Sequence, residues 1–266
     1  MTDGFGRVVR AEWTKFWSVR GTCWTLLIAV AVTIGFTVLF ASQGGTTATQ
    51  AGQGDDDVVV NSLRGVYFGQ LVVITLGVLV GTSEYATGLV RTTSAAVPRR
   101  SHVLAAKAVV LGIGMTAAGL VASFASYLLA QPLLQSNGYV APAYPPPSLR
   151  TEPVLRAIIG TGLFLTLLAL LGLGLGIILR RTAGAITALV ALTFVPLIAA
   201  EPGSPLLPAN VAMWVRRTVP EAGMAIQQTR DRADIAIGPW AGLGVLCAYT
   251  VVALLVANWL LSRRDA

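Results

Sequence analysis

The sequence predicts an all-α integral membrane protein built as a single transmembrane domain over residues 1–266, and two observations predict this class. First, 55% of the residues are hydrophobic and only 12% are charged, with a mean hydropathy of +0.71, whereas about a quarter of the residues of a soluble domain are charged. Second, apolar runs long enough to cross about 30 Å of hydrocarbon recur at 22–42, 65–83, 104–131, 154–179, 183–200 and 239–261. These six runs must be helices, because lipid offers no partners to backbone groups and none of the runs alternates as a barrel strand does.

The segment before the first span, residues 4–20, predicts an interfacial helix that lies along the membrane surface. Its apolar side chains share one helical face, namely Phe5, Val8, Val9, Trp13, Phe16 and Val19. Glu12 falls near the centre of this face. An unpaired carboxylate on this face would cost free energy. We therefore expect a basic or hydroxyl partner from another cytoplasmic segment, and residues 83–107 are the first candidate.

The distribution of charge predicts the orientation of the chain. With six spans both termini lie on one side, together with the second and fourth connections. That side holds twelve basic residues against four acidic ones, and the other side holds seven basic against eight acidic. Because short loops rich in Lys and Arg stay in the cytoplasm, both termini are expected there. The net charge of +7 then reflects membrane topology, and no nucleic-acid partner is expected.

The connection between the second and third spans, residues 84–100, predicts a short cytoplasmic amphipathic helix. Apolar or small side chains recur at helical spacing, at Ala86, Leu89, Val90, Thr93 and Val97, and Pro98 ends the pattern. A helix held at both ends by spans can pass a displacement directly into them. The alternative is an ordinary basic loop that obeys the positive-inside rule.

Two G-x-x-x-G pairs lie inside spans, Gly77 with Gly81 and Gly172 with Gly176. Such pairs let two helices approach closely. We expect them to serve packing within one chain, and a seam between two copies is the alternative.

Two connections on the predicted external side have different expectations. Residues 43–62 are rich in Gly, Thr and Gln and are expected to form a mobile loop. Residues 201–238, which follow Pro196 in the fifth span, contain apolar pieces at 211–215 and 223–226 that are too short to span. These pieces are expected to form re-entrant or surface helices that dip into the outer leaflet, where irregular backbone survives only if protein or a cavity covers it.

The chain lacks the residues that most membrane enzymes and ion-coupled carriers need. It has no phosphate-binding G-x-x-x-x-G-K-[ST] pattern, and its single histidine, His102, leaves no catalytic or metal-ligating set. No ionisable residue lies near the middle of a span, which disfavours an ion-coupled carrier. No catalytic residue, metal site or bound cofactor is therefore expected, and any transport must be powered from outside this chain.

Two stretches, "AEWTKFWSVRGTCWTL" (11–26) and "SEYATGLVRTTSAAVPRRSHVLAAK" (83–107), resemble the permease subunits of ABC exporters of the second structural type, particularly the small six-span actinobacterial ones. That family carries a Glu, Gly, hydrophobic, Pro-x-Arg pattern between its second and third spans, which falls here on Glu84, Gly88, Leu89, Pro98 and Arg100. The segment "VPEAGMAI" (219–226) is similar to the external re-entrant element of the family. The chain departs from it at Leu89, where the family often has Thr.

The resemblance implies a permease in a bacterial plasma membrane, with both termini in the cytoplasm. Its coupling helix would dock on a separate cytoplasmic ABC ATPase, which would bind the ATP and Mg²⁺. We expect the docking residues to be Glu84, Gly88, Leu89, Arg91, Pro98 and Arg100, with Glu12 as a tie from the interfacial helix to that region. The permease would act as a homodimer, or as a heterodimer with a second permease, and would export an amphipathic drug, an antibiotic or a lipid-like molecule. The alternatives are a membrane scaffold or assembly protein that transports nothing and, more weakly, an ion-coupled carrier.

Overall fold

A computed structural model of the chain describes residues 2–43, 57–87, 100–139, 148–149, 151–200, 206–230 and 237–264. In these ranges the ordered elements are all helices. Six of them are long and apolar enough to cross a membrane: α2 (Arg20–Ser42), α5 (Val66–Thr87), α7 (Arg100–Ser136), α8 (Glu152–Leu179), α9 (Thr182–Ala199) and α11 (Pro239–Arg264). The prediction of an all-helical protein with six spans is confirmed. The first and last residues of each predicted span lie within five residues of the first and last residues of the corresponding helix.

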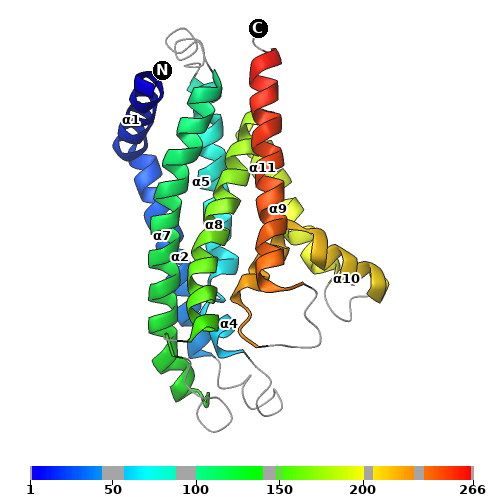
Figure 1. Cartoon of the computed structure of the whole chain (residues 1–266). Coiled ribbons are helices and arrows are strands. Elements are labelled where there is room, and N and C mark those ends of the chain that lie inside the picture. The colour runs from blue at the N-terminus through cyan, green and yellow to red at the C-terminus, as the bar shows by residue number, and fades with distance from the viewer. Residues whose placement is uncertain are drawn as a thin grey trace.

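Four shorter helices accompany the spans: α1 (Thr2–Ser18), α4 (Val58–Ser62), α10 (Ala209–Thr218) and the 3-10 helix η1 (Pro220–Gln227). Figure 1 shows both chain termini at one end of the bundle, which we call the terminal end, with α1 beside α7 there. The helix α4 lies toward the other end, and α10 projects from the side of the bundle (Figure 1).

Helix α8 lies at the centre of the bundle. Of its most apolar 18 residues 67% are buried, against 17% for α2 and for α9, and Phe164, Leu168 and Leu173 are completely buried. Helices α5, α7 and α11 all pack on it. The spans α2 and α9 therefore expose most of their surface, which can contact lipid or another chain.

The two G-x-x-x-G pairs bring α5 and α8 together. A Cβ atom on Gly77 would collide with the backbone of Ala169, and one on Gly172 would lie 3.1 Å from the carbonyl oxygen of Ile74. Similarly, a Cβ on Gly176 would lie 2.9 Å from the carbonyl oxygen of Val78. Since lipid tails are as apolar as the helices themselves, such close backbone approach is a main source of association between spans. Both motifs thus serve packing within one chain.

A two-residue turn joins α8 to α9. Arg180 adopts the left-handed conformation (φ 53°), and its N–H donates to the carbonyl of Gly176 over 2.9 Å, which closes the end of α8. Arg181 then precedes the first turn of α9. Pro196 lies inside α9, three residues before the helix ends at Ala199.

Helix α7 has 37 residues, so it is about 55 Å long and exceeds the hydrocarbon thickness of about 30 Å. Just past its far end, the side-chain Nδ2 of Asn137 donates to the carbonyl oxygens of Ala41 and Ser42, over 2.8 and 3.2 Å. These bonds satisfy carbonyls that the end of α2 leaves open. The far ends of α2 and α7 are thereby joined.

Candidate functional site

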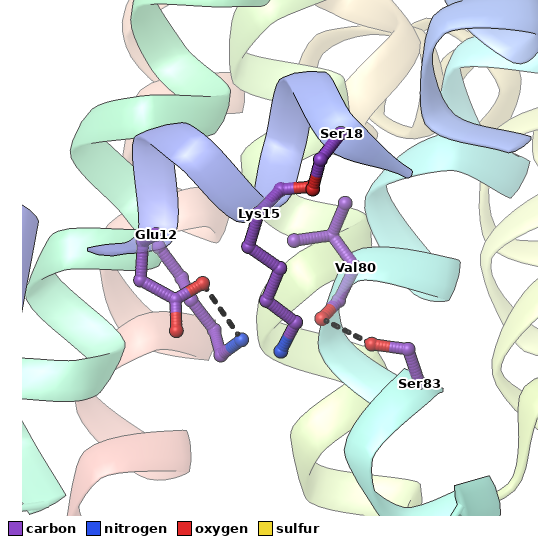
Figure 2. A network of polar contacts seen from close by, with 6 residues as sticks. Glu12, Lys15, Ser18, Val80 and Ser83 are labelled. Atoms are coloured by element: carbon purple, nitrogen blue, oxygen red, sulfur yellow. Dashed lines mark hydrogen bonds and ion pairs between the residues drawn. The ribbon is translucent and has the colours of Figure 1, made fainter. Parts of the chain in front are cut away.

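At the terminal end, α1 is tied to α7 by an ion pair. The Nζ atom of Lys107 lies 3.1 Å from Oε2 of Glu12, and the two side chains are only 7% and 13% exposed. In Figure 2 a dashed line from the carboxylate of Glu12, on α1, marks this ion pair. Lys107 is the last residue of the connection from which a basic partner for Glu12 is expected, so the structure supplies that partner.

The apolar face of α1 packs on α7 around this pair. Phe16 is 7% exposed, and its ring lies so close to Gly114 that an added Cβ would be 3.0 Å from it. The ring of Phe5 meets that of His102 edge-on, with centroids 5.8 Å apart. Trp13 and Trp17 remain exposed, a placement that suits aromatic side chains at a membrane surface.

A cavity of about 370 Å³ lies beneath α1, between α2, α5 and α7. Its volume falls within the range of small-molecule sites. Its walls are mostly apolar, with Glu12, Lys15 and Lys107 as the ionisable groups, and are formed by Phe16, Val19, Gly21, Thr22, Thr25, Leu76, Leu79, Val80, Ser83 and Val110 together with these three. In Figure 2 the side chain of Lys15 reaches from α1 toward Val80 and Ser83 of α5. The cavity thus adjoins the point where α5 leads into the connection to α7.

The predicted docking residues lie mainly outside the described part of the chain. Gly88, Leu89, Arg91 and Pro98 fall outside the described residues. Glu84 is in the last turn of α5 and Arg100 is the first residue of α7, but their side chains are also outside the described part. The structure therefore gives only where this segment leaves α5 and where it enters α7.

A second polar cluster surrounds η1. All eight residues of η1 are buried, and glycines of the neighbouring spans make room for it: a Cβ on Gly242 would collide with the carbonyl of Ala222, and one on Gly160 would collide with Ile226. Residues 223–226 are covered by protein, in line with the expectation for this piece, whereas residues 211–215 lie in α10, which has no buried residue. The glycines that receive η1, in α8 and α11, carry no distinguishing pattern in the sequence.

Asp57 joins α4 to the segment that follows η1. Its Oδ1 caps α4 by accepting from the backbone N–H of Val59 (3.0 Å) and Val60 (3.3 Å). The same carboxylate accepts from Thr229, through Oγ1 (2.8 Å) and N–H (2.6 Å), and from the N–H of Arg230 (3.2 Å). The expectation of a mobile loop over residues 43–62 is therefore wrong for 57–62, because the Asp57 cap and the burial of α4 hold this part in place.

Glu221 is the most deeply buried carboxyl group among the described residues, with 5% exposure. Its Oε1 accepts a hydrogen bond of 3.1 Å from Nε2 of Gln70 in α5. Burial raises the pKa of Glu221 to about 7, and the bond from Gln70 partly opposes this rise. A cavity of about 140 Å³ adjoins Glu221 and is also lined by Tyr67, Arg216, Gln227 and Gln228. The sequence gives no signal that pairs Gln70 with Glu221.

Comparison with known proteins adds no further assignment: no protein-family model matches the chain, and no curated protein matches it. Among the described residues, no group of three or more His, Cys, Asp or Glu side chains is placed to hold a metal ion. The functional argument therefore rests on the residues and contacts of the chain itself.

Proposed function

We propose that this chain is the membrane-spanning permease subunit of an ATP-driven ABC exporter whose ATP is hydrolysed by a separate cytoplasmic subunit. The observation that supports this best is the buried Glu12–Lys107 pair. It ties the amphipathic helix α1 to α7 seven residues after α7 begins, directly after the connection that carries the docking pattern. A simple surface anchor would not need a buried ion pair to the bundle.

The geometry favours a mechanical role for this end of the molecule. A cytoplasmic partner that displaces the 84–100 segment would move the ends of α5 and α7 together. The Glu12–Lys107 pair would carry that movement into α1, which covers the cavity of about 370 Å³. The binding of ATP to the partner would thus shift the population between inward-open and outward-open arrangements. ATP and Mg²⁺ would stay on the partner, and this chain would carry out no chemical step.

The proposed cargo is an amphipathic drug, an antibiotic or a lipid-like molecule. Apolar walls with a few ionisable groups, as in the cavity beneath α1, suit a molecule with both an apolar body and a polar group. The permease would work as two copies, or with a second permease, in a bacterial plasma membrane with both termini in the cytoplasm. The weakly buried faces of α2 and α9 leave surface for such a partner.

The docking residues can be tested by reversing their charge. Arg91→Glu with Arg100→Glu should abolish co-purification of a P-loop ATPase in mild detergent, detected by labelling with a photoreactive ATP analogue. The matched control is Arg216→Glu with Arg217→Glu, a basic pair at the end of α10 on the predicted external side. The control should retain the ATPase, and both variants should remain in the membrane.

Two results would contradict the proposal. One is undiminished co-purification by the Arg91 and Arg100 variant. The other is labelling of a cysteine at position 88 only from outside intact cells, because a cytoplasmic ATPase could not reach it there. A chain that retains no ATPase in any variant, and acts without ATP, would instead be the membrane scaffold.

A further inference from the structure

Glu221 of η1 and Gln70 of α5 form a buried pair that is joined by one hydrogen bond. Each of the two side chains also has one oxygen without a hydrogen-bond donor. Gln70 is completely buried and Glu221 is 5% exposed. Nε2 of Gln70 donates to Oε1 of Glu221 over 3.1 Å. The remaining oxygen of each side chain, Oε1 of Gln70 and Oε2 of Glu221, is also buried and has no donor. Leaving two buried acceptors unsatisfied in this way destabilises the fold.

A single proton would satisfy both oxygens. Two acceptors cannot bond to each other while both lack hydrogen, but a carboxylic acid both donates and accepts. We propose that Glu221 is a proton-binding site, and that its carboxylic acid O–H donates to Oε1 of Gln70 while Nε2 of Gln70 donates back, which closes a two-bond acid–amide pair between η1 and α5. The proton comes from water and returns to water, so no covalent bond other than O–H is made or broken.

The charged groups around η1 do not compensate an ionised Glu221. Arg216 of α10 lines the cavity next to Glu221. Among the described residues, however, it makes no ion pair with Glu221. Arg156 of α8 donates instead to the carbonyl of Gln228 over 2.6 Å and lies 3.9 Å from Glu152. Asp57 is engaged by Thr229 and Arg230. The other described ionisable side chains of the packed elements are Tyr67 of α5, Arg217 of α10, and Cys247, Tyr249 and Arg263 of α11, and α9 contributes none. Arg217 is exposed and donates to Sδ of Met213.

Burial of Glu221 also favours the protonated form of its carboxyl group. Burial disfavours the charged form of this carboxyl group and raises the pKa of Glu221 to about 7, although the hydrogen bond from Gln70 acts in the opposite direction. The group would therefore carry its proton in neutral or mildly acidic surroundings.

The Glu221–Gln70 pair makes the attachment of η1 to the bundle depend on pH. When Glu221 loses its proton, one bond of the pair disappears and a buried charge is left, so the position of η1 between α5, α8 and α11 is weakened. Movement of η1 into water would in turn release the proton. This property is independent of an ATPase, and in the proposed orientation it would respond to the pH outside the cell.

Infrared difference spectroscopy of the full-length protein tests the site directly. A protonated carboxyl gives a C=O band separate from those of carboxylates and amides. We expect the wild type to show such a band at about pH 6 and to lose it above about pH 8, and we expect Glu221→Gln to lack it at both values. The matched control is Glu152→Gln, which removes a carboxylate that is 75% exposed and should leave the band unchanged.

A second variant keeps the test decisive if Glu221→Gln does not fold. Gln70→Leu retains Glu221 but removes the acceptor of its proton, so the band should persist and move to higher frequency, as expected for a carboxyl without a hydrogen-bond partner. Absence of any band dependent on Glu221 at pH 6 would overturn the proposal, because Glu221 would then be ionised. A band that does not move in Gln70→Leu would also overturn it, since Gln70 would not be the acceptor.

Discussion

The ammonium group of Lys107 donates to the carboxylate of Glu12 across 3.1 Å, and this contact joins residues 95 positions apart in the chain. Both side chains are largely buried, so each charge gains compensation from the other. Loss of one partner should be worse than loss of both, because it leaves a buried charge alone.

Lys107→Met should therefore destabilise the protein by about 3 kcal/mol, and the double variant Glu12→Gln with Lys107→Met should recover most of that loss. Thermal unfolding in detergent measures both effects. Arg10→Gln is the control, since Arg10 is exposed on the same helix, and it should change little. Equal losses in the single and double variants would show that the two charges do not act as a pair.

Gly77→Ala should separate α5 from α8, because the new Cβ would collide with the backbone of Ala169. We expect a destabilisation of about 2 kcal/mol or more, seen as a lower unfolding temperature. Gly112→Ala is the matched control, because Gly112 of α7 has nothing within 4 Å of the added atom. The control should be neutral or stabilising, by up to about 1 kcal/mol, since alanine favours helices over glycine. The same loss in both variants would argue against close packing at Gly77.

Asp57→Ala should release α4 and the segment after η1 together, because one carboxylate holds both. The expected cost is about 2 kcal/mol or more, which combines a lost helix cap with lost charge-assisted bonds. Limited proteolysis should then cleave near Thr229 faster than in the wild type. Thr229→Ala removes only the side-chain bond of 2.8 Å and should give a smaller effect. Unchanged proteolysis in Asp57→Ala would show that other contacts suffice.

The stability of the protein should fall as pH rises from about 4.5 to about 7, because the pKa of Glu221 is raised from 4.5 to about 7 in the folded state. Between these values the folded chain binds more protons than the unfolded chain. The stabilisation is therefore complete below about pH 4.5 and lost above about pH 7, a change of about 3 kcal/mol. The difference in unfolding free energy between the wild type and Glu221→Gln, measured across this range, isolates the effect. A difference that is constant with pH would contradict the assigned pKa.

The spans could be predicted from the sequence because a run of about 20 apolar residues has few other stable fates. Their ends were predicted less well, because helices continue into polar residues that no longer carry the hydropathy signal. For example, α7 begins at Arg100 and extends to Ser136, beyond the predicted 104–131. The basic partner of Glu12 was also predictable, since a carboxylate on an apolar face requires one.

The contacts around η1 could not be predicted from the sequence. A five-residue helix such as α4 is too short to show periodicity, so the sequence places Asp57 within the predicted mobile loop 43–62. The pair of Gln70 and Glu221 spans 151 positions, and each residue alone is compatible with many environments. What brings them together is the tight seating of η1 against glycines of α8 and α11, which depends on the whole bundle.

The length of α7 has a mechanical consequence. It is pinned to α1 at Lys107 and to the end of α2 at Asn137, about 45 Å apart along its axis. Because α7 is held near both ends, rotation of α7 about either contact alone is restrained by the other contact. A displacement of α1 would therefore be passed to α7 and, through Asn137, to the far end of α2 on the opposite face of the bilayer.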